Sequence, residues 1–137
     1  RGKGAELNGE RIRVSTRKSL KDSLIGNTSH VNDSQDYTFE NIATFRALYK
    51  HSLTIRRSGC SALDLAYVAA GRLDGFWANG LGVWDIAAGM LIAEEAGALT
   101  SDFLGNPDYK KSDHYLCATP KCFKQMLEAI KPNFKAH

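Results

Sequence analysis

Residues 84–97 constrain the fold of this chain more than any other stretch. They read Trp-Asp-Ile-Ala-Ala-Gly-Met-Leu-Ile-Ala-Glu-Glu-Ala-Gly. This composition favours a helix, and Gly97 is placed to end it in a left-handed conformation. Apolar residues occupy almost the whole circumference, so we expect the helix to be buried. The small residues Ala87, Ala88 and Gly89 would let another backbone approach it closely.

Asp85 puts a carboxylate in the first turn of this otherwise apolar helix. An ionised carboxylate that is buried there needs a compensating partner, which could be backbone N–H groups, a cation or a metal ion. The structural alternative is a helix cap, in which the carboxylate accepts a hydrogen bond from the backbone. Residue type and position leave both interpretations open.

The rest of the chain alternates between strand and helix patterns. Short apolar runs predict strands near residues 12–14, 24–25, 53–55, 73–77, 99–103 and 115–118. Helical spacing predicts helices over 39–49 and 62–70, and Thr119-Pro120 opens a last helix that runs to about residue 130. Asn8-Gly9 indicates a tight turn, and the short polar residues 31–36 indicate a loop. Such alternation predicts one α/β layered domain.

Composition and charge exclude several classes of protein. A hydrophobic fraction of 43% and a charged fraction of 24% are typical of a soluble globular domain, and a net charge of +3 demands neither nucleic acid nor a membrane as partner. No apolar run approaches the ~20 residues of a membrane-spanning helix. The three cysteines form no C-x-x-C pair, which favours reduced thiols in the cytoplasm. His114, Cys117 and Cys122 lack a fourth ligand for zinc.

Gly59, Cys60 and Ser61 form a second candidate site. Glycine lets the backbone approach a ligand, and the start of the following helix presents free N–H groups that can hold a hydroxyl or a phosphate. The alternative is a strand-to-helix turn in which Ser58 or Ser61 caps the helix. The residues alone favour this structural turn.

Three blocks together resemble the inositol monophosphatase family of metal-dependent phosphatases. They are Gly4-Ala5 with Asn8-Gly9, the segment around Gly59-Cys60-Ser61, and Trp84-Asp85 with Ala87-Ala88-Gly89 and Gly97-Ala98. The resemblance covers nearly the whole chain, in the family's order and spacing. It implies the carboxyl-terminal portion of the layered αβαβα fold of the sugar-phosphatase type.

The resemblance also implies a function for the candidate residues. Asp85 falls on the aspartate that ligates a catalytic Mg²⁺ and approaches the substrate, and Gly59, Cys60 and Ser61 fall on positions whose backbone contacts the substrate ring. The implied reaction is Mg²⁺-dependent hydrolysis of a small phosphate monoester such as inositol monophosphate, by a homodimer with no membrane partner. No catalytic residue is assigned in this segment, and these four positions are expected to bind the substrate, with Asp85 also as a metal ligand.

Two departures from the family pattern matter. The Asp-Pro-x-Asp-Gly signature, which supplies most metal ligands, is absent. We therefore expect residues 1–137 to be a carboxyl-terminal αβ domain without the amino-terminal metal-binding half, and to be inactive alone. Ala78 stands where many members carry a glutamate that binds a substrate hydroxyl, which leaves the substrate open.

A different class of function stays open, namely a non-catalytic module that binds RNA or protein. The basic tail over 121–135 could face such a partner, although a solvated helix face explains it equally well. Among the remaining residues, we expect Trp77 and Trp84 to be core aromatics. Glu94 and Glu95 should lie on the exposed side of their helix. Asp74 is typical of a turn or of the start of a strand. We expect Asp64 to have a structural role, and it could pair with Arg56, Arg57 or Arg72.

Overall fold

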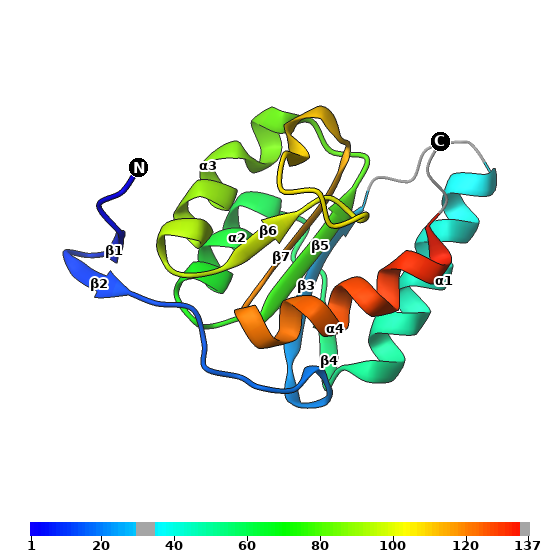
Figure 1. Cartoon of the computed structure of the whole chain (residues 1–137), viewed down its shortest axis with the longest axis horizontal. Coiled ribbons are helices and arrows are strands. Elements are labelled where there is room, and N and C mark those ends of the chain that lie inside the picture. Colours follow the sequence, from blue (N-terminus) through cyan, green and yellow to red (C-terminus); the bar gives the residue numbers. More distant parts are fainter. Residues whose placement is uncertain (30–34, 135–137) are drawn as a thin grey trace.

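A mixed five-stranded sheet forms the centre of the molecule (Figure 1). The computed structural model describes residues 1–29 and 35–134, and of residues 35–38 only the backbone. The strand order is β4-β3-β5-β7-β6. The strands are β3 (Leu24–Ser29), β4 (Thr54–Arg56), β5 (Gly75–Asn79), β6 (Leu99–Ser101) and β7 (His114–Ala118). Because β3 pairs in parallel with both β4 and β5, these three strands end at the same edge of the sheet.

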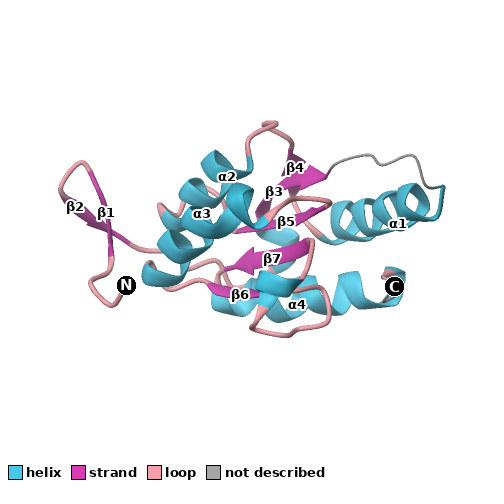
Figure 2. Ribbon diagram, turned by 90° about the horizontal axis from the view of Figure 1, so that it is seen from above, coloured by secondary structure: helices cyan, strands magenta, loops and turns pink. Residues whose placement is uncertain are grey.

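Helices cover both faces of this sheet (Figure 2). One face carries α1 (Gln35–His51) and α4 (Pro120–Ile130), and the other carries α2 (Ser61–Ala69) and α3 (Val83–Glu95). In the described part of the chain, short 3₁₀ helices at Leu20–Asp22 and Tyr109–Lys111 lie in connections, and another at Lys131–Asn133 follows α4. Alternation along β5 divides the core: Phe76 and Ala78 pack with α2 and α3, whereas Trp77 packs with α4.

The predicted elements agree with the structure except at a few boundaries. Helix α1 begins at Gln35, so residues 35 and 36 are helical where a loop was predicted; residues 31–34 of that loop lie outside the described residues. The first predicted strand is β2 (Glu10–Ile12) and ends before Val14. Val14 instead donates its N–H to the carbonyl oxygen of Ala96, at 3.0 Å.

A two-stranded ribbon extends from the main body (Figure 1). Strands β1 (Ala5–Leu7) and β2 are joined by Asn8 and Gly9, both with positive φ, as a tight hairpin turn requires. The carboxylate of Glu95 accepts hydrogen bonds from the N–H groups of Gly2 and Gly4, the second at 3.0 Å. The prediction that Glu95 points to solvent is therefore wrong, because this side chain fastens the ribbon to the end of α3.

The predicted burial of α3 on all sides is also wrong. Ile86, Gly89, Met90 and Ala93 are buried, but the opposite face of the helix is exposed, and Trp84 has 83% of its surface accessible. The residues of this exposed apolar face are Val83, Trp84, Ala87, Ala88 and Ile92. Composition alone predicts an apolar helix and cannot tell which of its sides another element covers.

Glycine at position 89 allows α2 and α3 to pack closely. A Cβ added there would lie 2.6 Å from the Cβ of Leu65, which is too close for any side chain. Glu94, on the same helix, is half-buried and accepts hydrogen bonds from Thr100 Oγ1 at 2.8 Å and from the Tyr109 hydroxyl at 2.9 Å. The expectation of an exposed Glu94 is thus wrong as well. None of the helices in the described part of the chain is long and apolar enough to span a bilayer.

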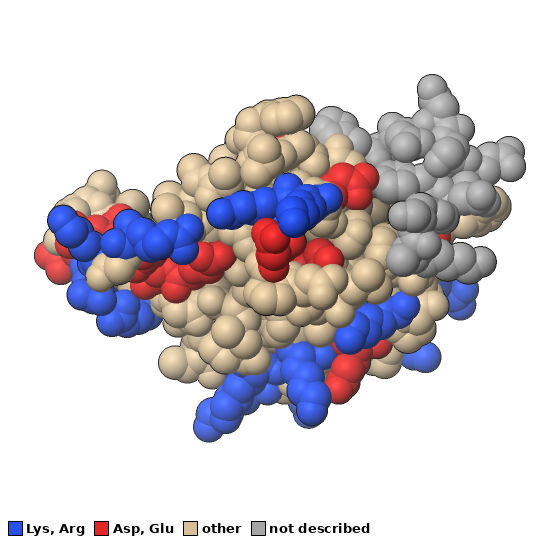
Figure 3. All heavy atoms as spheres, turned by 45° about the horizontal axis from the view of Figure 1, so that its top comes forward, with Lys and Arg blue, Asp and Glu red and all other residues tan. Residues whose placement is uncertain are grey.

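Charges of both signs are interleaved on the surface. On the face drawn in Figure 3, basic side chains form several separate groups, and acidic side chains lie beside most of them. Two surface ion pairs follow this pattern, Lys111–Asp108 at 3.9 Å and Lys124–Glu128 at 4.0 Å. Exposed pairs of this kind each contribute about 0–1 kcal/mol.

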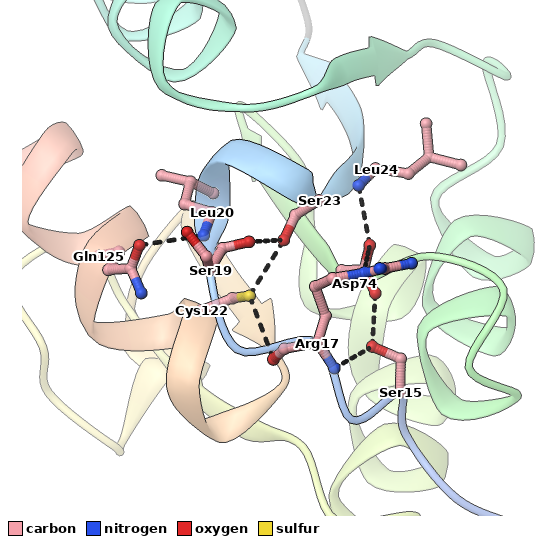
Figure 4. Close-up of polar contacts among 9 residues, drawn as sticks. All are labelled: Ser15, Arg17, Ser19, Leu20, Ser23, Leu24, Asp74, Cys122 and Gln125. Atoms are coloured by element: carbon pink, nitrogen blue, oxygen red, sulfur yellow. Dashed lines mark hydrogen bonds and ion pairs between the residues drawn. The ribbon is translucent and has the colours of Figure 1, made fainter.

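Asp74 anchors the connection between β2 and β3 (Figure 4). Its side chain is buried and accepts hydrogen bonds from the Ser15 hydroxyl and from the N–H of Leu24, the latter at 2.8 Å. Arg17 Nε lies 3.8 Å from the same carboxylate. Asp74 was predicted to be a turn residue, but its side chain also joins the segment at Ser15 and Arg17 to the starts of β3 and β5.

Candidate functional site

The carboxyl ends of β3, β4 and β5 meet at one edge of the sheet, and two helices begin there. Helix α2 follows β4 through Gly59 and Cys60, and α3 follows β5 and carries Asp85 in its first turn. Ligands of open α/β sheets bind at this edge. The fold therefore brings together all four residues predicted as a site: Gly59, Cys60, Ser61 and Asp85.

The turn before α2 is held by Ser58. Its hydroxyl oxygen accepts a hydrogen bond from the Cys60 N–H at 3.1 Å and donates to Asp64 Oδ1 at 2.9 Å. Gly59 has φ +81°, a conformation that other residues rarely adopt, and nothing lies within 4 Å of where its Cβ would be. The turn consequently leaves open space beside the free N–H groups of the α2 start.

Ser61 connects the two helix starts. Its hydroxyl donates to the main-chain carbonyl oxygen of Asp85 at 3.2 Å. This contact joins residues 24 positions apart in the sequence. It fixes the position of Asp85 relative to the turn at Gly59.

The Asp85 carboxylate is half-buried and partly occupied. Oδ2 accepts a hydrogen bond from the Gly82 N–H at 3.1 Å, which is one half of a capping box. No hydrogen bond or ion pair from the described residues engages Oδ1. The two interpretations of Asp85 are thus compatible, because one oxygen caps the helix and the other remains available to a ligand.

Asp64 lies beside this site and has a structural role. It is 2% exposed, and burial raises the pKa of its carboxyl despite the hydrogen bond from Ser58. Asp64 Oδ2 has no hydrogen-bond partner among the residues that the structure describes. No arginine forms an ion pair with it among the described residues, so the expected pairing is wrong; Arg72 lies instead over the Tyr67 ring, 5.4 Å from its centroid.

The described residues form no complete metal site around Asp85. Within residues 1–29 and 35–134, no three His, Cys, Asp or Glu side chains form a group that could hold a metal ion. Mg²⁺ prefers six oxygen ligands, several of them water, so one free carboxylate oxygen fits the role of a single ligand only. Cys117 and Cys122 pack in different core clusters, and no disulfide joins the three cysteines.

Two asparagines at the same edge were not predicted as site residues. Ala78 is fully buried, so its side chain offers a ligand nothing. The neighbouring Asn79 donates a hydrogen bond from its side-chain NH₂ group to Asn41 Oδ1, and its own Oδ1 is buried and has no partner within the described part of the chain. The sequence signal was weak, because Asn79 lies two residues after the predicted strand 73–77, and Asn41 comes from a helix 38 residues away.

Comparisons with known proteins show which proteins this chain is similar to. A match to the inositol monophosphatase family extends over residues 1–134. The Nus factor SuhB of Pseudomonas aeruginosa is 48% identical over 134 residues, which are 97% of this chain and 49% of that protein. The Nus factor SuhB of Escherichia coli K12 is 42% identical over 131 residues, or 96% and 49% of the two chains. The chain thus spans about half the length of these relatives.

Solved structures show the same fold. The extragenic suppressor protein SuhB from Bartonella henselae has a TM-score of 0.89 at 36% identity, with 98% of this chain and 51% of that chain covered. The inositol monophosphatase from Anabaena has a TM-score of 0.86 at 32% identity, with 96% and 52% covered. The predicted αβ sandwich is therefore confirmed.

Proposed function

This chain belongs to the inositol monophosphatase family, and from that premise we propose that it forms the carboxyl-terminal half of a Mg²⁺-dependent phosphatase. In the full-length protein the reaction is hydrolysis of a small phosphate monoester, with inositol monophosphate as the first candidate. The supporting observation is Asp85, which has one carboxylate oxygen free of protein partners at the sheet edge where α2 and α3 begin.

In this proposal each site residue has a separate task. Asp85 Oδ1 is one metal ligand, while Oδ2 stays on the Gly82 N–H and keeps the carboxylate oriented. Bound Mg²⁺ lowers the pKa of a water and neutralises charge on the phosphoryl group. The backbone of Gly59, Cys60 and Ser61 contacts the substrate, with the Gly59 and Ser61 N–H groups as donors, because the Cys60 N–H already donates to the Ser58 hydroxyl oxygen. The Ser61–Asp85 hydrogen bond sets the spacing between the two halves of the site.

The remaining metal ligands would come from the amino-terminal half of the protein. The chain covers 49% of the Pseudomonas aeruginosa relative, and residues 1–137 are proposed as the carboxyl-terminal domain. The exposed apolar face of α3 and the ribbon β1–β2 are the surfaces on which that half would pack, because isolated ribbons and large apolar patches are rarely stable in water. We also propose that the full-length protein is a homodimer and that it is located in the cytoplasm, where its three free cysteines would stay reduced.

A second candidate follows from the names of the relatives, which are Nus factors. It is a non-catalytic module that binds RNA or protein. The exposed lysines of α4 and its end, Lys121, Lys124 and Lys131, would be the contact surface. Glu128 lies among these lysines and pairs with Lys124, which weakens this candidate, because a nucleic-acid site gathers basic side chains on one face.

One substitution separates the two candidates. In full-length protein with Mg²⁺ and inositol 1-phosphate, Asp85→Asn should reduce kcat/KM at least ~100-fold, because an amide is a poor Mg²⁺ ligand. Asn keeps an oxygen for the Gly82 N–H, so the unfolding free energy should change by less than about 1 kcal/mol. Asp108→Asn, at an exposed carboxylate paired with Lys111, is the matched control and should retain activity. Salt-dependent RNA binding that survives Asp85→Asn, without turnover in the unmodified protein, would favour the second candidate.

A further inference from the structure

The Ser58 hydroxyl makes two hydrogen bonds, one to each side of the turn before α2. Its oxygen accepts from the Cys60 N–H at 3.1 Å, and its proton goes to Asp64 Oδ1 at 2.9 Å. The Cys60 carbonyl oxygen lies 3.3 Å from the same hydroxyl, but a hydroxyl has one proton, and a carboxylate accepts it more strongly than a carbonyl does. Asp64 therefore sets the direction of the Ser58 hydroxyl, and the Ser58 oxygen in turn fixes the Cys60 N–H.

We propose that Asp64 is a positioning residue of the substrate-binding turn. Through the Ser58 hydroxyl, Asp64 keeps the Cys60 N–H engaged and holds the N–H groups of Gly59 and Ser61 in place for substrate oxygens. The inference rests on the proposed phosphatase function and adds to it a residue that touches neither the substrate nor the metal.

The turn offers two backbone donors. Within the described part of the chain, no hydrogen bond uses the N–H of Gly59 or of Ser61, the first residue of α2. The N–H of Cys60, between them, is taken by Ser58. The turn therefore presents two separated donors at a helix start, where oxygens of a phosphate ester bind favourably. If the Ser58 hydroxyl could rotate, the Cys60 N–H would be released and the spacing of the donors would change.

Gly26 gives the Asp64 side chain a fixed place against β3. A Cβ added at Gly26 would lie 3.3 Å from Asp64 Cγ and 3.4 Å from Asp64 Cβ, so the carboxylate packs directly on the strand. Asp64 is 2% exposed, and its own N–H donates to the Cys60 carbonyl oxygen at 3.1 Å at the start of α2. An anchor on a packed helix holds a binding turn more precisely than a loop residue does.

The fold itself does not benefit from a carboxylate at this position. Burial raises the pKa of the Asp64 carboxyl, which means that the charged form is less stable here than in water. A neutral side chain of similar size would avoid this cost. Residues that lower stability while they hold a ligand-binding segment are typical of functional sites.

The turn is also joined to the proposed metal ligand. Ser61, at its end, donates its hydroxyl to the Asp85 carbonyl oxygen at 3.2 Å. In the proposed function the reacting phosphoryl group lies at Asp85, whereas the N–H groups of the turn bind the substrate without taking part in the chemical step. Loss of the contact between Ser58 and Asp64 should therefore weaken substrate binding more than it slows the chemical step.

The test measures KM and kcat separately for full-length protein with Mg²⁺ and inositol 1-phosphate. Ser58→Ala and Asp64→Ala should each raise KM at least ~5-fold and change kcat less than ~2-fold, because one positioning hydrogen bond is lost. Asp64→Asn keeps an oxygen for the Ser58 proton and should rescue KM to within ~2-fold of the unmodified protein. The Ser58→Ala/Asp64→Ala double variant should be no worse than either single variant, because all three lose the same contact.

Ser23→Ala is the matched control. Ser23 is fully buried just before β3, and its hydroxyl donates to the Ser19 carbonyl oxygen at 2.7 Å, so this variant also loses a serine hydrogen bond but leaves the turn intact. It should lower stability and leave KM unchanged. An unchanged KM in Ser58→Ala would overturn the proposal, and this exposed position tests the contact even if Asp64→Ala does not fold. Asp64→Asn as impaired as Asp64→Ala, additive effects in the double variant, or an equal rise of KM in Ser23→Ala would also overturn it.

Hydrogen exchange at the Cys60 amide gives a readout that does not depend on turnover. In NMR of the full-length protein, this amide should exchange at least ~5-fold faster in Ser58→Ala and Asp64→Ala than in the unmodified protein, and Asp64→Asn should retain the slow exchange. If these differences are seen but no phosphate ester is hydrolysed, Asp64 positions the turn and the proposed phosphatase function fails. If esters are hydrolysed but neither the exchange nor KM responds to the variants, the positioning role fails alone.

Discussion

The hydroxyl of Ser61 donates a hydrogen bond to the main-chain carbonyl oxygen of Asp85 at 3.2 Å, across the starts of two neighbouring helices. Each helix start carries one part of the candidate site, and this bond is the polar contact between them. Any tilt of α3 relative to α2 would move the Asp85 carboxylate away from the turn at Gly59. The contact therefore stabilises the packing of α2 against α3 and also positions the Asp85 carboxylate.

Ser61→Ala should weaken both. Loss of one hydrogen bond between neighbouring helices should lower the unfolding free energy by about 1 kcal/mol. In full-length protein it should also lower kcat/KM by about tenfold, because Asp85 is held less firmly. Denaturant unfolding and steady-state kinetics measure the two effects. Thr16→Ala, at an exposed position, is the control; equal results for the two variants would show that the bond does not position Asp85.

The 137-residue polypeptide alone should have no appreciable phosphatase activity. Asp85 is the proposed metal ligand, no group of three potential ligands occurs among the described residues, and a single carboxylate binds Mg²⁺ only weakly. The assay uses inositol 1-phosphate and Mg²⁺, with circular dichroism to establish that the polypeptide is helical. Turnover at the rate of the full-length protein would contradict the assignment of the other ligands to the amino-terminal half.

Gly89→Ala should destabilise the domain even though alanine is the better helix former. Helix propensity favours the substitution by about 1 kcal/mol. The new Cβ, however, would lie 2.6 Å from Leu65 Cβ and 2.7 Å from Leu65 Cδ1. Overpacking of this kind costs about 1–3 kcal/mol, so the net change in a denaturation experiment should be a loss. Ala87→Ser, on the exposed side of the same helix, should change stability little; a stabilised Gly89→Ala variant would mean that α2 and α3 can move apart freely.

Asp64→Asn should remove a pH-dependent loss of folding stability. Burial raises the folded-state pKa of Asp64 above its ordinary value of 3.8, so between the two values the folded state holds the proton more tightly than the unfolded state. The contribution of Asp64 is therefore most favourable below pH 3.8 and declines as pH rises through the raised pKa. Relative to the unmodified protein, Asp64→Asn should gain stability as pH increases over that interval and keep the gain at neutral pH. Unfolding titrations of both proteins across acidic pH test this, and a constant difference would show that the two states share one pKa.

The sequence predicts the order and type of the elements well, because the patterns that specify them are local. Strand and helix alternation, the Asn8-Gly9 turn and the start of α4 at Pro120 depend on neighbouring residues only. The errors concern burial. Trp84 and Glu94 were placed on the wrong sides of α3, since an apolar composition does not reveal which face another segment covers.

The sequence likewise predicts one part of the candidate site and misses another. Asp85 and the Gly59 turn were identified because their motifs are contiguous. The contact between Asn79 and Asn41 was not, because the two residues come from β5 and α1, and no short motif contains both. Only the packing of α1 against the sheet brings Asn41 to the end of β5.

The contrast between the two tryptophans provides an optical reporter. Trp77 is sealed in the core at 2% exposure, and Trp84 stands in solvent at 83%. Since the chain has two tryptophans in all, its fluorescence is the sum of one constant, shielded emitter and one emitter that responds to whatever docks on α3. A blue shift and a loss of acrylamide quenching would accompany contact with a second polypeptide there, and no added dye would be needed to see it.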